Sequence, residues 1–411
     1  MRGIGRLKVL AAVGAVALVI SACGSSKSTS TPTTVSPTTA GSGGSTAPTT
    51  ASPVSGTPYK LMWTYTTSDG AETGGNVSAI EKGVDARGGI AGHPLQIVLC
   101  GDNNVASQAT VCARQAVADP NMLGVIADAS TCSSQLLPLL TQAQMASINA
   151  DFFCPEDFKS PAVFPFNGGT FDDVGASAIG VKYFNDPNVV ATTVDLPAGR
   201  EYPPLVQEVV GPVGGKVVGA VYVPYTAADL APFAAQIASY KGVLAEGNPT
   251  EIGIRLGKAL QSIGYNQPVI YNSTVFDPAI IKTNFGNPTN AYLYVYYDES
   301  SPGWQMFLSD MSTYAPGSTY QASDLVDAWL AANVVAQIAK TLPTVSAKAI
   351  FSYLSTATDL TTFGMTPPLN FTVPQKALGG LIPRAVNPDV ALYHYVNGAV
   401  VRVTPFEDFL P

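Results

Sequence analysis

Two hydrophobic periodicities alternate along most of the chain after residue 58. Short apolar runs, which are typical of buried strands, are separated by longer segments with apolar residues at helical spacing. In the first half, strands are predicted at 60–66, 93–100, 122–128 and 146–151. Helices are predicted between them at 75–87, 106–119 and 133–144. A β-α series of this kind is typical of a parallel, doubly wound sheet.

The same alternation restarts at residue 188. Strands are predicted at 188–196, 215–224, 242–247 and 268–273, with helices at 203–213, 227–240 and 249–264. We therefore predict an α/β protein with two lobes, each built on a doubly wound parallel sheet. Further on, a long helix is predicted at 322–342 and a strand pair within 390–403, where Asn397-Gly398 is a strong hairpin signal.

The first residues follow neither pattern. Three basic residues (Arg2, Arg6 and Lys8) precede a short apolar run, and small residues lead up to Cys23. This arrangement predicts an export signal over 1–23. The letters VISAC also resemble a bacterial lipobox, whose cysteine becomes the lipidated first residue. An ordinary cleaved signal with an incidental cysteine is the alternative.

Residues 24–57 contain 28 Ser, Thr, Pro or Gly residues out of 34, which predicts a disordered tether. Without the three basic residues of the leader, 18 basic residues stand against 29 acidic ones. This acidic excess argues against nucleic acid as a partner and against electrostatic docking on anionic lipid.

Four cysteines remain after Cys23, and four allow three pairings. Export to an oxidising compartment favours disulfides. We expect the two pairings that are local in sequence, Cys100–Cys112 and Cys132–Cys154, each worth about 3 kcal/mol by loop closure. There is no C-x-x-C motif, so neither a zinc site nor a redox pair is expected.

Several stretches resemble one known family in the order in which they occur. They are ARGGIAGHPLQIVLCGDNN at 86–104, the helix-strand-turn stretch at 109–135 and PFNGGTFDDVGASAIGVKYF at 165–184. Over residues 58–411 the chain resembles type I periplasmic-binding proteins, and the leucine/isoleucine/valine-binding branch most of all. No single motif is specific to this family, but the order in which the motifs occur along the chain is.

The resemblance implies a clamshell whose two lobes are joined by three hinge strands. Lobe one would comprise 58–166 plus 292–365, and lobe two 167–291 plus 366–411. A small ligand would bind between the lobes and favour the closed form. The protein would be a monomeric solute-binding lipoprotein, held outside the cytoplasmic membrane by its lipid, that delivers ligand to the membrane subunits of an ABC importer. It would need no cofactor or metal and would not be an enzyme.

Candidate ligand-binding residues follow the predicted strands, because the carboxyl ends of parallel strands line the binding edge of such sheets. In lobe one they are Thr67, Ser68, Ser130, Thr131, Ser133, Ala150, Asp151 and Phe152. In lobe two they are Asp195, Tyr202, Asn248, Ser273 and Phe276. The hydroxyls of the serine-rich turn are equally suited to capping the next helix, and Tyr202 could instead belong to a flexible loop.

Two departures from the family pattern bear on the ligand. The loop Ala150-Asp151-Phe152 lacks the threonine that grips an amino acid in the family, and the loop after Tyr271 lacks the usual acid. A buried ammonium without a counter-charge is costly, although Asp151 could supply one from the other lobe. The expected ligand is therefore a small carboxylic acid, an amide or an aromatic acid rather than a plain branched-chain amino acid.

Other classes of function have weaker support. A ligand-sensing receptor of a signalling system remains an alternative, and an exported α/β hydrolase a weaker one. The only histidines, His93 and His394, are about 300 residues apart, and no G-x-S-x-G motif is present. The glycines before Lys216 lack the spacing of a phosphate loop. Asp172 and Asp173 are explained by capping at a helix start.

Overall fold

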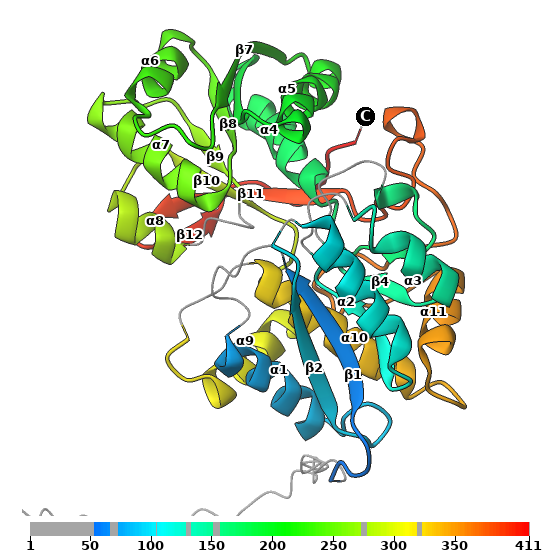
Figure 1. The fold of residues 1–411 in the computed structure, drawn as a ribbon. Helices are drawn as coiled ribbons and strands as arrows, with labels where there is room; N and C mark the ends of the chain where they lie inside the picture. The colour runs from blue at the N-terminus through cyan, green and yellow to red at the C-terminus, as the bar shows by residue number, and fades with distance from the viewer. Residues whose placement is uncertain are drawn as a thin grey trace, which may run out of the picture. The chain divides into compact units, whose positions relative to one another are not determined.

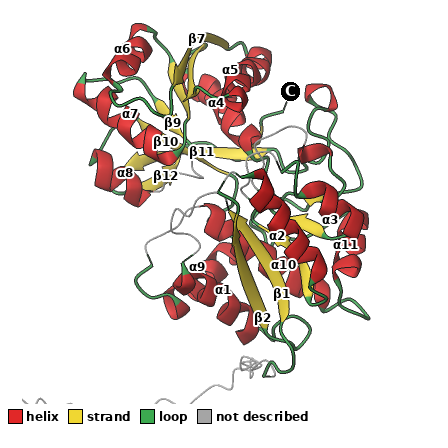
Figure 2. Cartoon of the chain, viewed as in Figure 1, coloured by secondary structure: helices red, strands yellow, loops and turns green. Residues whose placement is uncertain are grey.

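The computed structural model describes residues 53–65, 73–103, 105–128, 133–150, 157–272, 278–318 and 323–410. Its strands form two sheets, and the helices that connect them pack against the sheets (Figures 1 and 2). This confirms the predicted α/β class.

The first sheet has five strands in the order β2-β1-β3-β4-β5, and every neighbouring pair is parallel. The strands are β1 (Tyr59–Tyr65), β2 (Leu95–Gly101), β3 (Met122–Ile126), β4 (Ala146–Ile148) and β5 (Val163–Phe164). All five residues of β3 are buried, as expected for a parallel strand covered on both faces.

Helices cover both faces of this sheet. One layer contains α2 (Ala106–Ala118) and α3 (Leu137–Ala143), which contact each other and the strands. Another group of helices consists of α1 (Gly74–Ala86), α9 (Pro302–Tyr314), α10 (Ser323–Ala339) and α11 (Ala347–Thr356). Within it α1 contacts α9 and α10, and α10 contacts β3 and α11. Helices from the C-terminal half of the chain thus cover a sheet whose strands all come from the N-terminal half.

The second sheet has eight strands, with the order β12-β11-β10-β9-β8-β6-β7 and β13 paired to β11. Its parallel strands are β6 (Asn188–Val194), β7 (Lys216–Val223), β8 (Val243–Gly247), β9 (Val269–Tyr271) and β10 (Ala291–Val295). Three further strands, β11 (Asp389–Val396), β12 (Ala399–Arg402) and β13 (Glu407–Asp408), are antiparallel additions. The second sheet is therefore mixed rather than wholly parallel.

The helices of the second sheet are α4 (Thr170–Phe184), α5 (Pro197–Val210), α6 (Ala231–Ser239), α7 (Thr250–Ser262) and α8 (Pro278–Phe285). Helices α4 and α5 contact each other, as do α6 and α7. The predicted hairpin is confirmed, since Asn397 and Gly398 both have positive φ between the paired strands β11 and β12.

Several boundaries differ from the sequence prediction, and three of them matter most here. Strand β10 pairs with β9 and β11, so residues 291–295 belong to the second sheet and not to the first-lobe range 292–365. Helix α3 begins at Leu137 rather than at 133, with Pro138 in its first turn, where proline is favoured. Helix α5 begins at Pro197 rather than at 203, although Pro203 and Pro204 lie inside it.

The predicted disulfide Cys100–Cys112 is present, with a Cα–Cα distance of 5.9 Å between the end of β2 and helix α2. Cys23, Cys132 and Cys154 lie outside the described residues. Across the described part of the chain, no helix combines the length and the apolar character needed to cross a membrane. No group of three or more His, Cys, Asp or Glu residues in that part could hold a metal ion.

Candidate functional site

Five of the predicted ligand-binding residues fall within the described structure. Ser133 follows β3, Ala150 follows β4, Asp195 follows β6, Asn248 follows β8, and Tyr202 lies in α5. The others lie outside the described residues; they are Thr67, Ser68, Ser130, Thr131, Asp151, Phe152, Ser273 and Phe276. Four of the five described residues therefore follow the carboxyl ends of parallel strands.

In the first sheet, Ser133 is part of a buried polar cluster around Asp128. The Thr64 hydroxyl donates to Asp128 Oδ1 at 2.7 Å, and the Ser133 hydroxyl donates to Asp128 Oδ2 at 3.0 Å. The Ser133 backbone N–H donates to the Asp157 carboxylate at 3.3 Å. Ser133 is only 1% exposed and does not cap α3, which begins at Leu137 without a side-chain cap. Ser133 thus ties the end of β3 to the turn that follows.

Ala150 is fully buried, and the residue before it sits in a left-handed conformation, with φ of 52° at Asn149. The Asn149 amide donates to the buried carboxylate of Asp327 on α10 at 2.8 Å, and its carbonyl oxygen accepts from the Phe166 N–H. The end of β4 is thereby joined to the segment that leaves the first sheet after β5.

Three segments of the chain pass between the two sheets, and hydrogen bonds connect them. The first segment leaves β5 and contains Asn167, whose amide contacts Asp327. The second leaves β10 and contains Tyr296 and Tyr297, whose hydroxyls both donate to Asp327. The third leads into β11, and its Asn387 amide donates to the Phe166 carbonyl at 2.9 Å. Asp327 is 1% exposed and is the acceptor that two of these segments share.

Asp195, after β6, forms an ion pair with Arg200 of α5 at 2.5 Å. The Arg200 guanidinium also lies 5.1 Å from the centre of the Tyr222 ring. Both partners are partly exposed, at 32% for Asp195 and 59% for Arg200. The Asp195 carboxylate is therefore paired with a cation from α5, the helix that follows its own strand.

Tyr202 is buried in α5, so its expected alternative as a residue of a flexible loop is wrong. Its ring covers Gly247 at the end of β8 so closely that a Cβ on Gly247 would lie 2.9 Å from Tyr202 Cζ. Burial raises the pKa of the Tyr202 hydroxyl well above its ordinary value, and the nearby carboxyls of Asp173 and Glu246 raise the pKa further. Tyr202 therefore stays neutral and brings α4, α5 and β8 together.

Asn248 belongs to a second buried polar group that the sequence prediction only partly found. Its backbone N–H and its amide both donate to Glu246 Oε1, at 3.2 and 2.8 Å, and the amide also contacts Thr192. Burial raises the pKa of Glu246 to about 8. Neither Glu246 Oε2 nor Asn248 Oδ1 has a hydrogen-bond partner among the described residues. A pKa of about 8 favours the protonated carboxyl at pH 7.

The region after β9, where the family pattern would place an acid, carries an amide. Asn272 follows Tyr271 and accepts a hydrogen bond from the Tyr294 hydroxyl at 2.7 Å. The described strand ends of the second sheet therefore present Asp195 paired to a cation, Glu246 protonated, and amides at Asn248 and Asn272.

The two histidines have structural contacts. His93 Nδ1 lies 2.9 Å from the Thr57 carbonyl oxygen, and its ring packs on Tyr59. His394 Nε2 lies 3.0 Å from the Thr289 carbonyl oxygen, and its ring stacks on Tyr292. One nitrogen of each ring thus faces a backbone carbonyl rather than a side-chain nucleophile.

Comparison with known proteins gives a family match. The model of a family described as periplasmic binding protein matches residues 62–376. No curated protein matches the chain.

Solved structures share the fold at low sequence identity. An extracellular ligand-binding receptor from Verminephrobacter eiseniae superposes with a TM-score of 0.70 at 18% identity, covering 84% of this chain and 100% of its own. A fatty acid ABC transporter substrate-binding protein from Thermomonospora curvata gives 0.71 at 14% identity, with coverage of 88% and 95%. A branched-chain amino acid ABC transporter protein from Thermus thermophilus with bound valine gives 0.71 at 14%, with coverage of 85% and 96%.

Proposed function

The chain belongs to the periplasmic binding protein family, and from this premise we propose that it is the extracytoplasmic solute-binding lipoprotein of an ABC importer. The observation that carries the proposal is the hydrogen-bonded junction around Asp327, which connects segments passing between two α/β sheets. Such a junction suits a hinge between two ligand-binding lobes.

We place lobe one at 58–166 plus 296–365, and lobe two at 167–295 plus 366–411. The second boundary follows Val295 because β10 pairs within the second sheet. Cys23 would carry the lipid, and residues 24–57 would tether the folded part to the outer face of the cytoplasmic membrane. The mature protein would act as a monomer.

The proposed ligand is a small carboxylic acid, an amide or an aromatic acid. The second sheet supports this choice, because Arg200 neutralises the Asp195 carboxylate and the Glu246 carboxyl is protonated. Neither carboxyl then offers an unpaired negative charge to the ammonium of an amino acid, and an unbalanced buried charge is costly. The amides of Asn248 and Asn272, together with the Tyr202 ring, suit a ligand with polar and apolar parts.

A thermal-shift panel tests both the function and the ligand class. A ligand that binds only the folded protein adds about 2.7 kcal/mol of stability at 100 times its Kd, so it raises the melting temperature. We expect saturable shifts from members of the acid and amide groups and none from leucine, isoleucine or valine. Shifts from these three amino acids alone would overturn the ligand class. The absence of any shift across a broad solute panel would argue against the binding function itself.

A further inference from the structure

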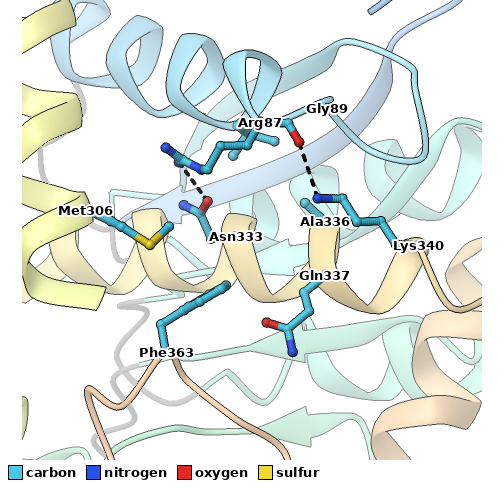
Figure 3. A pocket seen from close by; sticks show the side chains of 9 residues that line it. Arg87, Gly89, Met306, Asn333, Ala336, Gln337, Lys340 and Phe363 are labelled. Carbon is cyan, nitrogen blue, oxygen red and sulfur yellow. Dashed lines mark hydrogen bonds between the residues drawn. The ribbon is translucent and has the colours of Figure 1, made fainter. Parts of the chain in front are cut away.

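A small cavity lies on the first sheet's side of the molecule, away from the candidate ligand residues. It opens between the end of α1, helices α9 and α10, and the loop that carries Phe363 (Figure 3). Its volume is about 100 Å³. None of the described candidate ligand-binding residues lines it. Within the described part of the chain, the cavity lining and the candidate ligand-binding residues therefore do not overlap.

One part of the cavity lining is apolar. It includes Val84 of α1, Met306 of α9, Ala336 of α10 and the ring of Phe363. Phe363 has φ of 57°, an uncommon conformation for a bulky residue. The Phe363 ring thus lines the cavity from a backbone position that costs conformational energy.

On one side, the polar part of the cavity lining is held by hydrogen bonds and carries no net charge. The Arg87 guanidinium donates to both Asp310 oxygens, at 2.8 and 2.6 Å, and to Asn333 Oδ1 at 2.8 Å. Asp310 also accepts from the indole N–H of Trp329 at 2.7 Å. These bonds hold Arg87 in one orientation, and Asp310 neutralises it.

Lys340 and Gln337 provide the remaining polar groups. The Lys340 ammonium donates to the Arg87 carbonyl at 3.3 Å, as Figure 3 shows, and forms no ion pair with a carboxylate among the described residues. The Gln337 amide, half-buried in the lining, has no hydrogen bond to another described side chain. The cavity is therefore bordered by one positive charge, on the exposed Lys340, that no carboxylate of the described residues neutralises, and by the Gln337 N–H donors beside an apolar wall.

We propose that this cavity binds a short-chain monocarboxylate. The carboxylate accepts hydrogen bonds from the Lys340 ammonium and the Gln337 amide, and the alkyl part packs against Met306, Ala336 and Phe363. The size agrees, since the cavity volume of about 100 Å³ is several times the roughly 10–15 Å³ that a single water needs in the same measure, which leaves room for a few heavy atoms. A ligand with an ammonium group or with two negative charges fits less well, because the lining contributes one positive charge.

Butyrate is the probe, and the full chain with [¹³C-methyl]methionine is the sample. The Met306 methyl resonance, assigned with a Met306→Leu variant, reports on this cavity and not on the proposed site between the lobes. We expect butyrate to shift it saturably at constant ionic strength, and butyramide, which has the same shape without the charge, to bind at least ten-fold more weakly.

Two substitutions at Lys340 and one control complete the test. Lys340→Gln should weaken butyrate binding at least ten-fold, Lys340→Arg should retain most of it, and Lys348→Gln, at an exposed lysine of α11, should leave it unchanged. Lys340 and Lys348 are both exposed, so all three variants should fold. A butyrate response equal in Lys340→Gln and the unmodified protein, or equal for butyrate and butyramide, would overturn the proposal. So would a Met306 resonance that butyrate never shifts.

Discussion

At the end of β8 a single carboxyl group is buried without a charged partner among the described residues. Glu246 is 1% exposed, and only its Oε1 receives hydrogen bonds, both from Asn248. Burial is the main cause of its raised pKa, because ionisation would leave a charge in an apolar surrounding. The neutral form keeps the loop between β8 and α7 closed on itself.

Glu246→Gln should remove a pH dependence of stability. The pKa of Glu246 is about 8 in the folded protein and near 4.5 when exposed, so the folded form holds a proton that the unfolded chain releases between these values. Stability should therefore fall as the pH rises from about 5 to 8, and that fall should be smaller by a few kcal/mol in the variant. Urea unfolding at several pH values gives the free energy of unfolding and thus measures this pH dependence.

Gln keeps the accepting oxygen for Asn248, so the variant should fold. The exposed substitution Glu251→Gln in the first turn of α7 is the control and should behave like the unmodified protein. Parallel pH profiles for Glu246→Gln and the unmodified chain would show that Glu246 titrates normally.

At the scale of elements, the disulfide joins a strand to the helix that follows it. Cys100 is the last residue but one of β2, and Cys112 lies in α2, 12 residues further along. The disulfide reaches α2 near its middle, since Cys112 is the seventh residue of Ala106–Ala118. A crosslink of this kind acts mainly by restricting the unfolded chain.

Replacing both cysteines with alanine should destabilise the protein by about 3 kcal/mol, the value expected for a loop of this length. The double variant Cys100→Ala/Cys112→Ala is preferable to a reductant, which would also act on the other cysteines. Guanidinium unfolding gives the loss as a lower midpoint. Since Cys112 is buried and Cys100 is not, the single variant Cys100→Ala separates the crosslink from core packing. An unchanged midpoint in that single variant would mean that the crosslink contributes little.

At the scale of the whole molecule, Asp327 links segments that are far apart in the sequence. It sits on α10 against the first sheet and accepts hydrogen bonds from Asn149, Tyr296 and Tyr297. The Asn167 amide approaches the same carboxylate at 3.4 Å. Donors from two parts of the chain, 149–167 and 296–297, thus share one acceptor near the proposed hinge.

Asp327→Asn should destabilise the protein by about 2–4 kcal/mol, because the NH2 group that replaces one carboxylate oxygen cannot accept a hydrogen bond from the donors that face it. The matched control is Asp359→Asn at an exposed aspartate, expected to change stability by less than about 0.5 kcal/mol. Urea unfolding at pH 7 compares the two variants. Equal midpoints would show that the Asp327 junction is not a major source of stability.

The fold was largely predictable because its information is local. Buried parallel strands are continuous apolar runs, and the covering helices have apolar residues at helical spacing, so β3 and α1 could be located without their neighbours. Strand β10 was harder to assign. Its sequence fits either sheet, and only pairing with β9 and β11 placed it in the second one.

The candidate site was predictable only in part. The rule that ligands meet the carboxyl ends of parallel strands singled out Ser133, Asn248 and Tyr202, and the structure places them there or against those ends. It could not tell that the Ser133 hydroxyl is used by Asp128, or that Glu246 is uncharged. Both facts depend on residues that are distant in sequence or on burial, which no local pattern records.

By itself, the sequence determined the alternation of strands and helices, the Asn397-Gly398 hairpin and the local disulfide, because each depends on residues within a short stretch. Only the tertiary structure decided which sheet β10 joins, that Asp327 links distant segments, and that a cavity beside Lys340 carries a net positive charge. These features arise from burial and from contacts between residues far apart in the chain. The energy of a carboxyl or an ammonium group depends on that surrounding and not on its sequence neighbours.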